Sequence, residues 1–140
     1  MGTVSRSGTV HASPEVVFSF LADFEAQPRW ADVVKKIWYN TKSHEGVGVT
    51  FTRILKRSID EHELEVRSIV THWEKGERVG WRNTYPDGRT EDLIGTVKPF
   101  RGASKLTLTS VSDHQKGSAL TRIGRHLSEE IQLINTLLER

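Results

Sequence analysis

Residues Gly117 to Glu139 read GSALTRIGRHLSEEIQLINTLLE, a pattern typical of one long amphipathic helix. At a rise of about 1.5 Å per residue this helix is roughly 33 Å long, about the width of a small domain, so we expect it to lie across a broad sheet. Gly124 interrupts the apolar stripe at a cost of about 1 kcal/mol relative to alanine, and we expect it to leave space on the buried side. Aliphatic residues three or four positions apart form the stripe: Leu120, Ile123, Leu127, Ile131, Ile134 and Leu138.

The chain before this helix has the composition of β-strands. Six segments rich in Val, Ile, Thr and Trp are separated by short turns containing Gly, Pro and Asp, which favours an antiparallel meander. We expect these strands at Ile37–Thr41, Val47–Lys56, Glu61–Glu74, Arg78–Tyr85, Thr90–Lys98 and Ser104–Val111.

The N-terminal part predicts one more strand and two short helices. Val4–His11 alternates loosely, as a strand does. The segment Ser13–Glu15 then supplies an N-cap serine, a proline at the first helical position and an acidic residue beside it. A second short helix is expected over Phe24–Asp32. The order of elements predicts an α+β fold, in which a curved seven-stranded antiparallel sheet wraps around the long C-terminal helix.

Length and composition exclude several classes of protein. The chain has 140 residues, and we expect residues 1–140 to form one domain. Lys plus Arg is 20 against 18 Asp plus Glu, a formal net charge of +2 without a basic run, which argues against nucleic acid as a partner. There is no cysteine, so disulfides and thiolate chemistry are excluded. No apolar stretch approaches the ~18 residues of a membrane span, and we expect a cytoplasmic protein.

A resemblance to a known family is carried by four segments: Val10–Phe18 with its continuation to Trp30, Gly46–Val49, Val70–Arg82 and Ser104–Leu108. Together they resemble the START-like superfamily (SRPBCC), which includes Bet v 1-like and polyketide cyclase/dehydrase-type proteins. The sequence departs from the usual pattern in two turns, where Gly102-Ala103 replaces a glycine pair and Lys75-Gly76 lacks a proline. The resemblance implies the helix-grip fold, with an interior cavity between the C-terminal helix and the sheet.

Strand alternation indicates which side chains face that cavity, taking the apolar positions as inward. The expected lining is apolar with a few polar exceptions. The ligand-binding candidates are Trp30, Phe51, Arg53, Val70, Trp81, Asn83, Tyr85, Glu91, Leu93, Leu108, Ser110, Gly124 and Leu127.

Several candidates have two interpretations. Arg53 either binds an anionic group or lies at the rim of the cavity. Glu91 lies at the rim or pairs with Arg53, because burial of an unpaired carboxylate is costly. His72 is either a general base on the inward face or a surface or satisfied core histidine. Trp30 and Trp81 present flat faces to a planar guest or belong to the core.

We expect the protein to bind one small hydrophobic molecule, aromatic and polyketide-, quinone- or lipid-like, as a monomer or homodimer. The alternative is a polyketide cyclase or aromatase that directs aldol closure and dehydration, with His72 or Tyr85 moving protons and Arg53 orienting an enolate or carboxylate. A further alternative is self-resistance by sequestering a toxic natural product. Because the sequence has no His-Glu-x-x-His pattern and no dinucleotide loop, we expect no metal and no cofactor.

Overall fold

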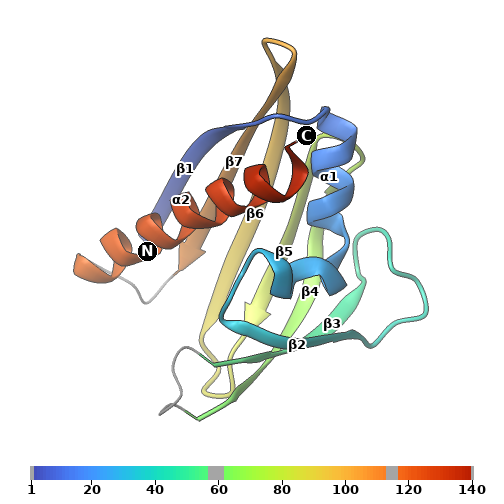
Figure 1. Ribbon diagram of the computed structural model, residues 1–140. Coiled ribbons are helices and arrows are strands. Elements are labelled where there is room, and N and C mark those ends of the chain that lie inside the picture. The colour runs from blue at the N-terminus through green and yellow to red at the C-terminus, as the bar shows by residue number, and fades with distance from the viewer. Residues whose placement is uncertain (1, 57–61, 113–116, 140) are drawn as a thin grey trace.

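The computed structural model describes residues 2–56, 62–112 and 117–139, which form an antiparallel sheet with helices packed on one face (Figure 1). The order of elements is the one predicted, although Glu61, assigned to the start of the fourth strand, lies outside the described residues. The strands are β1 (Gly2–Val10), β2 (Val34–Tyr39), β3 (Thr50–Leu55), β4 (Leu64–Glu74), β5 (Arg78–Thr84), β6 (Thr90–Phe100) and β7 (Ala103–Ser112). The helices are α1 (Pro14–Ala22), the 3₁₀ helix η1 (Phe24–Arg29) and α2 (Ser118–Leu138).

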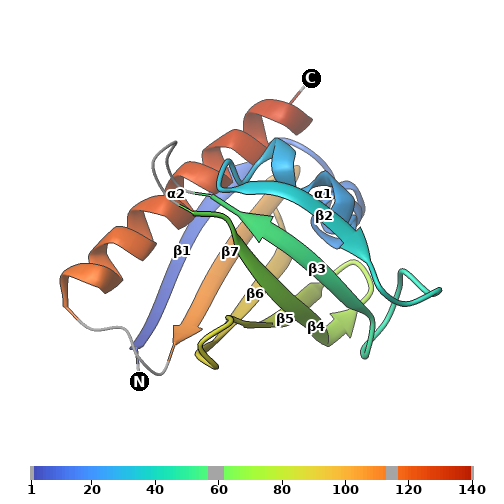
Figure 2. The ribbon, with the colours of Figure 1, turned by 90° about the horizontal axis from the view of Figure 1, so that it is seen from below.

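The sheet has the strand order β1-β7-β6-β5-β4-β3-β2, and every neighbouring pair is antiparallel. Strands β2 to β7 form a meander, and β1 pairs with β7 so that the first and last strands meet. The sheet is strongly curved, and α2 runs along β1 on its concave side (Figure 2). Helix α1 packs over β5, β6 and β7, while η1 packs over β2. The expected helix-grip architecture is confirmed.

Helix α1 forms where the sequence places a cap. The Ser13 hydroxyl accepts a hydrogen bond from the Val16 backbone N–H at 3.4 Å, and Pro14 occupies the first turn, where its missing N–H costs nothing. The inner face of the helix buries Val17, Phe18, Leu21 and Ala22. This face holds α1 against the middle strands of the sheet and fixes where the following η1 begins.

Helix α2 approaches β1 more closely than side chains would normally allow. A Cβ atom added at Gly8 would lie 2.7 Å from Cγ2 of Ile131, and one added at Gly124 would overlap the guanidinium of Arg6, whose Cζ would be 2.8 Å away. The expectation that Gly124 leaves open space is therefore wrong, because Arg6 from β1 occupies it. His126, two residues further on, is exposed to solvent.

A register shift in β4 changes which side chains face inward. Val70 pairs with Trp81, but His72 pairs with Gly80, so one residue of β4 is left without a partner between them. Such a bulge reverses the alternation of the residues that follow it. The His72 ring consequently lies beside Gly80 and Ile94, and Trp73 points to the concave side, where it meets Phe18. The expected inward position of His72 is wrong for this reason.

Within the part of the chain that the structure describes, no helix has the length and apolar character required to cross a membrane.

Candidate ligand-binding site

The concave face of the sheet is an apolar floor into which a small group of polar side chains is set. Most of the apolar residues predicted to contact a ligand are buried there, and Leu93 is partly buried against them. Phe51 stacks on Phe24 of η1 at 4.3 Å between ring centroids, and Trp81 meets Phe24 edge-on at 5.3 Å. The buried apolar candidates are Trp30, Phe51, Val70, Trp81, Leu108 and Leu127.

Arg53 is a buried basic group on this face. It projects from β3, is only 6% exposed, and its Nη1 donates a hydrogen bond to Oε1 of Gln27 at 3.2 Å. Burial lowers the pKa of the Arg53 guanidinium, while the nearby charges of Glu91 and Glu130 oppose that effect. Arg53 is thus a buried group and not a rim residue.

Four buried N–H donors, on Arg53, in η1 or on residues next to η1, lack a hydrogen-bond acceptor among the described residues. They are Nε of Arg53, Nε2 of Gln27 and the indole Nε1 atoms of Trp30 and Trp81. Gln27 and Trp30 belong to the same turn of chain, since the Trp30 backbone N–H donates to the Gln27 carbonyl oxygen at 3.0 Å. A buried donor left unpaired costs about 1–3 kcal/mol, so this cluster favours a partner that supplies oxygen atoms.

Glu91 organises the other polar side chains of the face. Its carboxylate accepts hydrogen bonds from Asn83 Nδ2 at 3.2 Å, Tyr85 Oη at 3.5 Å and Ser110 Oγ at 3.4 Å. Asn83 is oriented in turn by Ser68, whose hydroxyl donates to Asn83 Oδ1 at 2.7 Å. Among the described residues Glu91 forms no ion pair with Arg53, so the charge of this carboxylate is met by neutral donors rather than by the arginine.

Glu130 completes the polar group from the side of α2. Burial raises the pKa of its carboxyl to about 8; the nearby Arg53 opposes this effect, and the negative charges of Glu91, Asp32 and Glu129 add to it. A carboxyl with this pKa holds its proton in most molecules at neutral pH and can donate a hydrogen bond. Sequence reasoning missed this residue, although Glu130 lies three positions after Leu127 and four before Ile134 on the apolar stripe.

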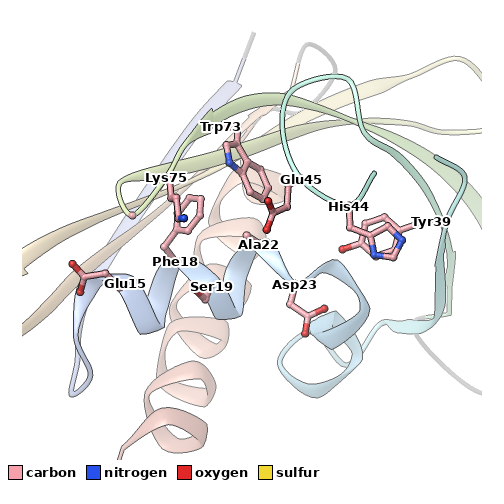
Figure 3. Close-up of a pocket in the computed structure, with 11 residues that line it drawn as sticks. Glu15, Phe18, Ser19, Ala22, Asp23, Tyr39, His44, Glu45, Trp73 and Lys75 are labelled. Atoms are coloured by element: carbon pink, nitrogen blue, oxygen red, sulfur yellow. The ribbon is translucent and has the colours of Figure 1, made fainter. Parts of the chain in front are cut away.

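Two hollows in the described part of the chain lie outside the space between α2 and the sheet. One, of about 290 Å³, lies where α1 meets the β2–β3 loop and the β4–β5 turn (Figure 3). We call it the α1 pocket; its wall includes Phe18, Asp23, Tyr39, His44, Glu45 and Trp73. The other, of about 560 Å³, is a depression on the convex face beside Trp38 and Arg67. Neither was anticipated from strand alternation.

The described residues contain no group of three or more His, Cys, Asp or Glu side chains arranged to hold a metal ion. The polar groups that the structure places on the concave face are one buried guanidinium, two carboxyl groups in different environments and their hydrogen-bond partners.

A curved sheet gripping a C-terminal helix, with polar groups buried on its concave side, defines a helix-grip protein of the START-like superfamily. The chain belongs to the family described as polyketide cyclase / dehydrase and lipid transport, whose family model matches residues 1–128. A comparison with curated proteins gives no significant match.

Solved structures with the same fold share little sequence with this chain. A START superfamily protein from Mycobacterium smegmatis is 16% identical with a TM-score of 0.76, covering 98% of this chain and 97% of its own. Protein MLL2253 from Mesorhizobium loti is 13% identical with a TM-score of 0.77, covering 99% and 98%. The Aha1 dimer from Colwellia psychrerythraea is 14% identical with a TM-score of 0.70, covering 99% and 97%. At these identities the likeness shows the fold alone.

Proposed function

We propose that this protein binds one small hydrophobic molecule bearing carbonyl, phenol or carboxylate oxygens against the concave face of the sheet. The observation that carries the proposal is the set of four buried N–H donors without acceptors on Arg53, Gln27, Trp30 and Trp81. Oxygen atoms of a bound ligand would satisfy these donors, and the buried guanidinium favours an oxygen that carries negative charge.

The surroundings of these donors favour a flat guest. Phe24, Phe51 and Trp81 form a cluster of packed rings directly beside η1, and aromatic faces suit planar or polycyclic molecules. A polyketide- or quinone-like molecule combines such a skeleton with several oxygen atoms, whereas a simple alkyl chain would leave the donors unpaired. We therefore rank aromatic oxygenated ligands above fatty acyl chains.

Binding is tested by isothermal titration and tryptophan fluorescence with three probes: a hydroxyanthraquinone, a naphthoquinone and a fatty acid. We expect the oxygenated aromatic probes to bind and Arg53→Met to weaken them by about tenfold or more, as expected for loss of a charge-assisted hydrogen bond. Arg82→Met is the matched control, because Arg82 lies on the exposed face and pairs with Asp92. Equal affinities for wild type and Arg53→Met would contradict the proposal, as would a failure of both aromatic probes to bind.

A second candidate function, cyclisation of a poly-β-ketone, is favoured by the pairing of two ionisable groups. The Tyr85 hydroxyl points to the Glu91 carboxylate at 3.5 Å, so the carboxylate can orient it, and the Glu130 carboxyl can act as an acid. His72 takes no part in this arrangement, because it lies on the other face of the sheet. Product analysis with a reactive poly-β-ketone thioester tests this candidate: Tyr85→Phe and Glu130→Gln should each change the proportion of cyclised product. A product mixture identical to that formed without protein would rule it out.

A further inference from the structure

The α1 pocket is built from aromatic walls that other residues hold in place. Tyr39 stacks face to face with His44, with 3.6 Å between ring centroids and an interplanar angle of 7°, and its hydroxyl accepts a hydrogen bond from the Phe24 backbone N–H at 3.2 Å. On the other side Trp73 meets Phe18 edge-on at 5.4 Å. These contacts fix two separate aromatic surfaces on either side of one hollow.

The same pocket carries an excess of negative charge. Three carboxylates, those of Glu15, Asp23 and Glu45, line it against the single lysine Lys75. None of these three acids forms an ion pair with any residue that the structure describes. The chain as a whole has a formal charge of +2, so the negative charge of the pocket does not reflect an acidic composition of the whole protein.

Two of the three carboxylates of the pocket lie near its aromatic walls. In Figure 3 Asp23 and Glu45 are drawn between Trp73 and the stacked Tyr39–His44 pair, while Lys75 and Glu15 lie on the far side of Trp73. Burial raises the pKa of the Tyr39 hydroxyl, and the negative charge of Asp23 raises it further. The part of the pocket between Trp73 and Tyr39 therefore carries negative charge.

We propose that the α1 pocket binds a small organic cation, an ammonium group carried on an aromatic body, at a site separate from the concave face. The ring of Trp73 attracts a cation through its negative quadrupole, and the carboxylates of Asp23 and Glu45 supply the opposite charge. Tyr39, one ring face of which His44 covers, forms the facing aromatic wall. An anion of the same shape is repelled by the same two carboxylates. Because both acids are exposed to solvent, their attraction is screened, and the binding is weak and sensitive to salt.

Three molecules of matched shape test the charge preference: phenethylammonium, 2-phenylethanol and phenylacetate, titrated at low salt up to about 10 mM, a range that covers millimolar affinity. We expect phenethylammonium to bind at least about tenfold more tightly than the alcohol, and phenylacetate not to bind. In ¹⁵N-labelled protein the indole signal of Trp73 should shift, while those of Trp30 and Trp81 remain in place. Equal binding of the alcohol and the ammonium ion, no binding of the ammonium ion, or shifts confined to Trp30 and Trp81 would each overturn the proposal.

A double variant, Asp23→Asn with Glu45→Gln, tests the two carboxylates without disturbing the fold, because the Asp23 side chain makes no capping hydrogen bond. It should lose the preference for phenethylammonium over 2-phenylethanol. Glu65→Gln, on the convex face, is the control and should retain that preference. Arg53→Met should also retain the preference for phenethylammonium. Failure of ligand binding at the concave face can therefore be distinguished from failure of cation binding in the α1 pocket. Unchanged affinity in the double variant would overturn the assignment of these two acids.

Discussion

The ionisable side chains on the concave face differ in how each is satisfied. Glu91 accepts hydrogen bonds from three neutral donors, and Arg53 donates one to a glutamine oxygen. Glu130 instead retains its proton, because its pKa is raised to about 8. Because an ionised carboxyl loses its hydration on burial, protonation is the least costly state for a group that lacks such donors. With a pKa raised to about 8, Glu130 changes its charge near neutral pH and is a source of measurable pH dependence.

Replacing Glu130 with Gln should stabilise the protein at high pH and leave it unchanged at low pH. Below the ordinary pKa of 4.5 the carboxyl is neutral in both the folded and the unfolded chain. As the pH rises from 4.5 to about 8, only the unfolded chain loses the proton, so the free energy of unfolding of the wild type falls. Because Glu130 is partly exposed, we expect the variant to gain on the order of 1–3 kcal/mol above pH 8.

Urea unfolding at pH 5 and pH 8.5 measures this difference. Glu65→Gln is the control, because the Glu65 side chain is exposed on the convex face and forms no ion pair among the described residues. Its effect on the free energy of unfolding should be similar at both pH values. A Glu130→Gln variant whose effect does not change between the two pH values would show that this carboxyl ionises normally in the folded protein.

At the scale of elements, the contact between α2 and β1 depends on two glycines that face different kinds of neighbour. A methyl group at Gly124 would meet the flexible end of Arg6, which can swing away. A methyl group at Gly8 would meet Cγ2 of Ile131, a buried β-branched side chain with one preferred rotamer. The two positions should therefore respond in opposite directions to the same substitution.

We expect Gly124→Ala to raise the free energy of unfolding by up to about 1 kcal/mol, the gain in helix propensity. Gly8→Ala should lower it by about 1–3 kcal/mol, because α2 must shift away from β1. Thermal and urea unfolding of the two single variants decide between these outcomes. If Gly124→Ala is the less stable of the two, the Arg6 guanidinium is a fixed part of the interface and not a movable side chain.

For the molecule as a whole, periodicity in the sequence was sufficient to predict the fold but only part of the site. The N-cap at Ser13 and the inward parity of Arg53 and Asn83 follow from local rules, and the structure agrees with them. The bulge before His72 was missed, because the change of alternation after Val70 is carried by the single apolar residue Trp73, and the polar residues between them fit either face. The α1 pocket also escaped prediction, because it is formed by a loop, a turn and a helix that only the folded chain brings together.

The buried Arg53–Gln27 contact links function to the stability of the whole molecule. A buried guanidinium loses most of its hydration on folding, and replacing a buried set of paired charged groups with apolar side chains of similar volume is often stabilising by about 1–4 kcal/mol. The single variant Arg53→Met leaves the Gln27 side chain without its donor, so part of this gain is lost. The double variant Arg53→Met with Gln27→Leu removes both polar groups.

We therefore expect the melting temperature, measured by differential scanning calorimetry, to rise from the wild type to Arg53→Met and again to the double variant. Affinity for the oxygenated aromatic probes should fall in the same order, because the groups that destabilise the fold are those proposed to meet the ligand. A double variant that melts below the wild type would show that Arg53 and Gln27 hold η1 against β3. In that case the buried donors serve the architecture of the sheet, and the case for a ligand at this face would rest on the binding titrations alone.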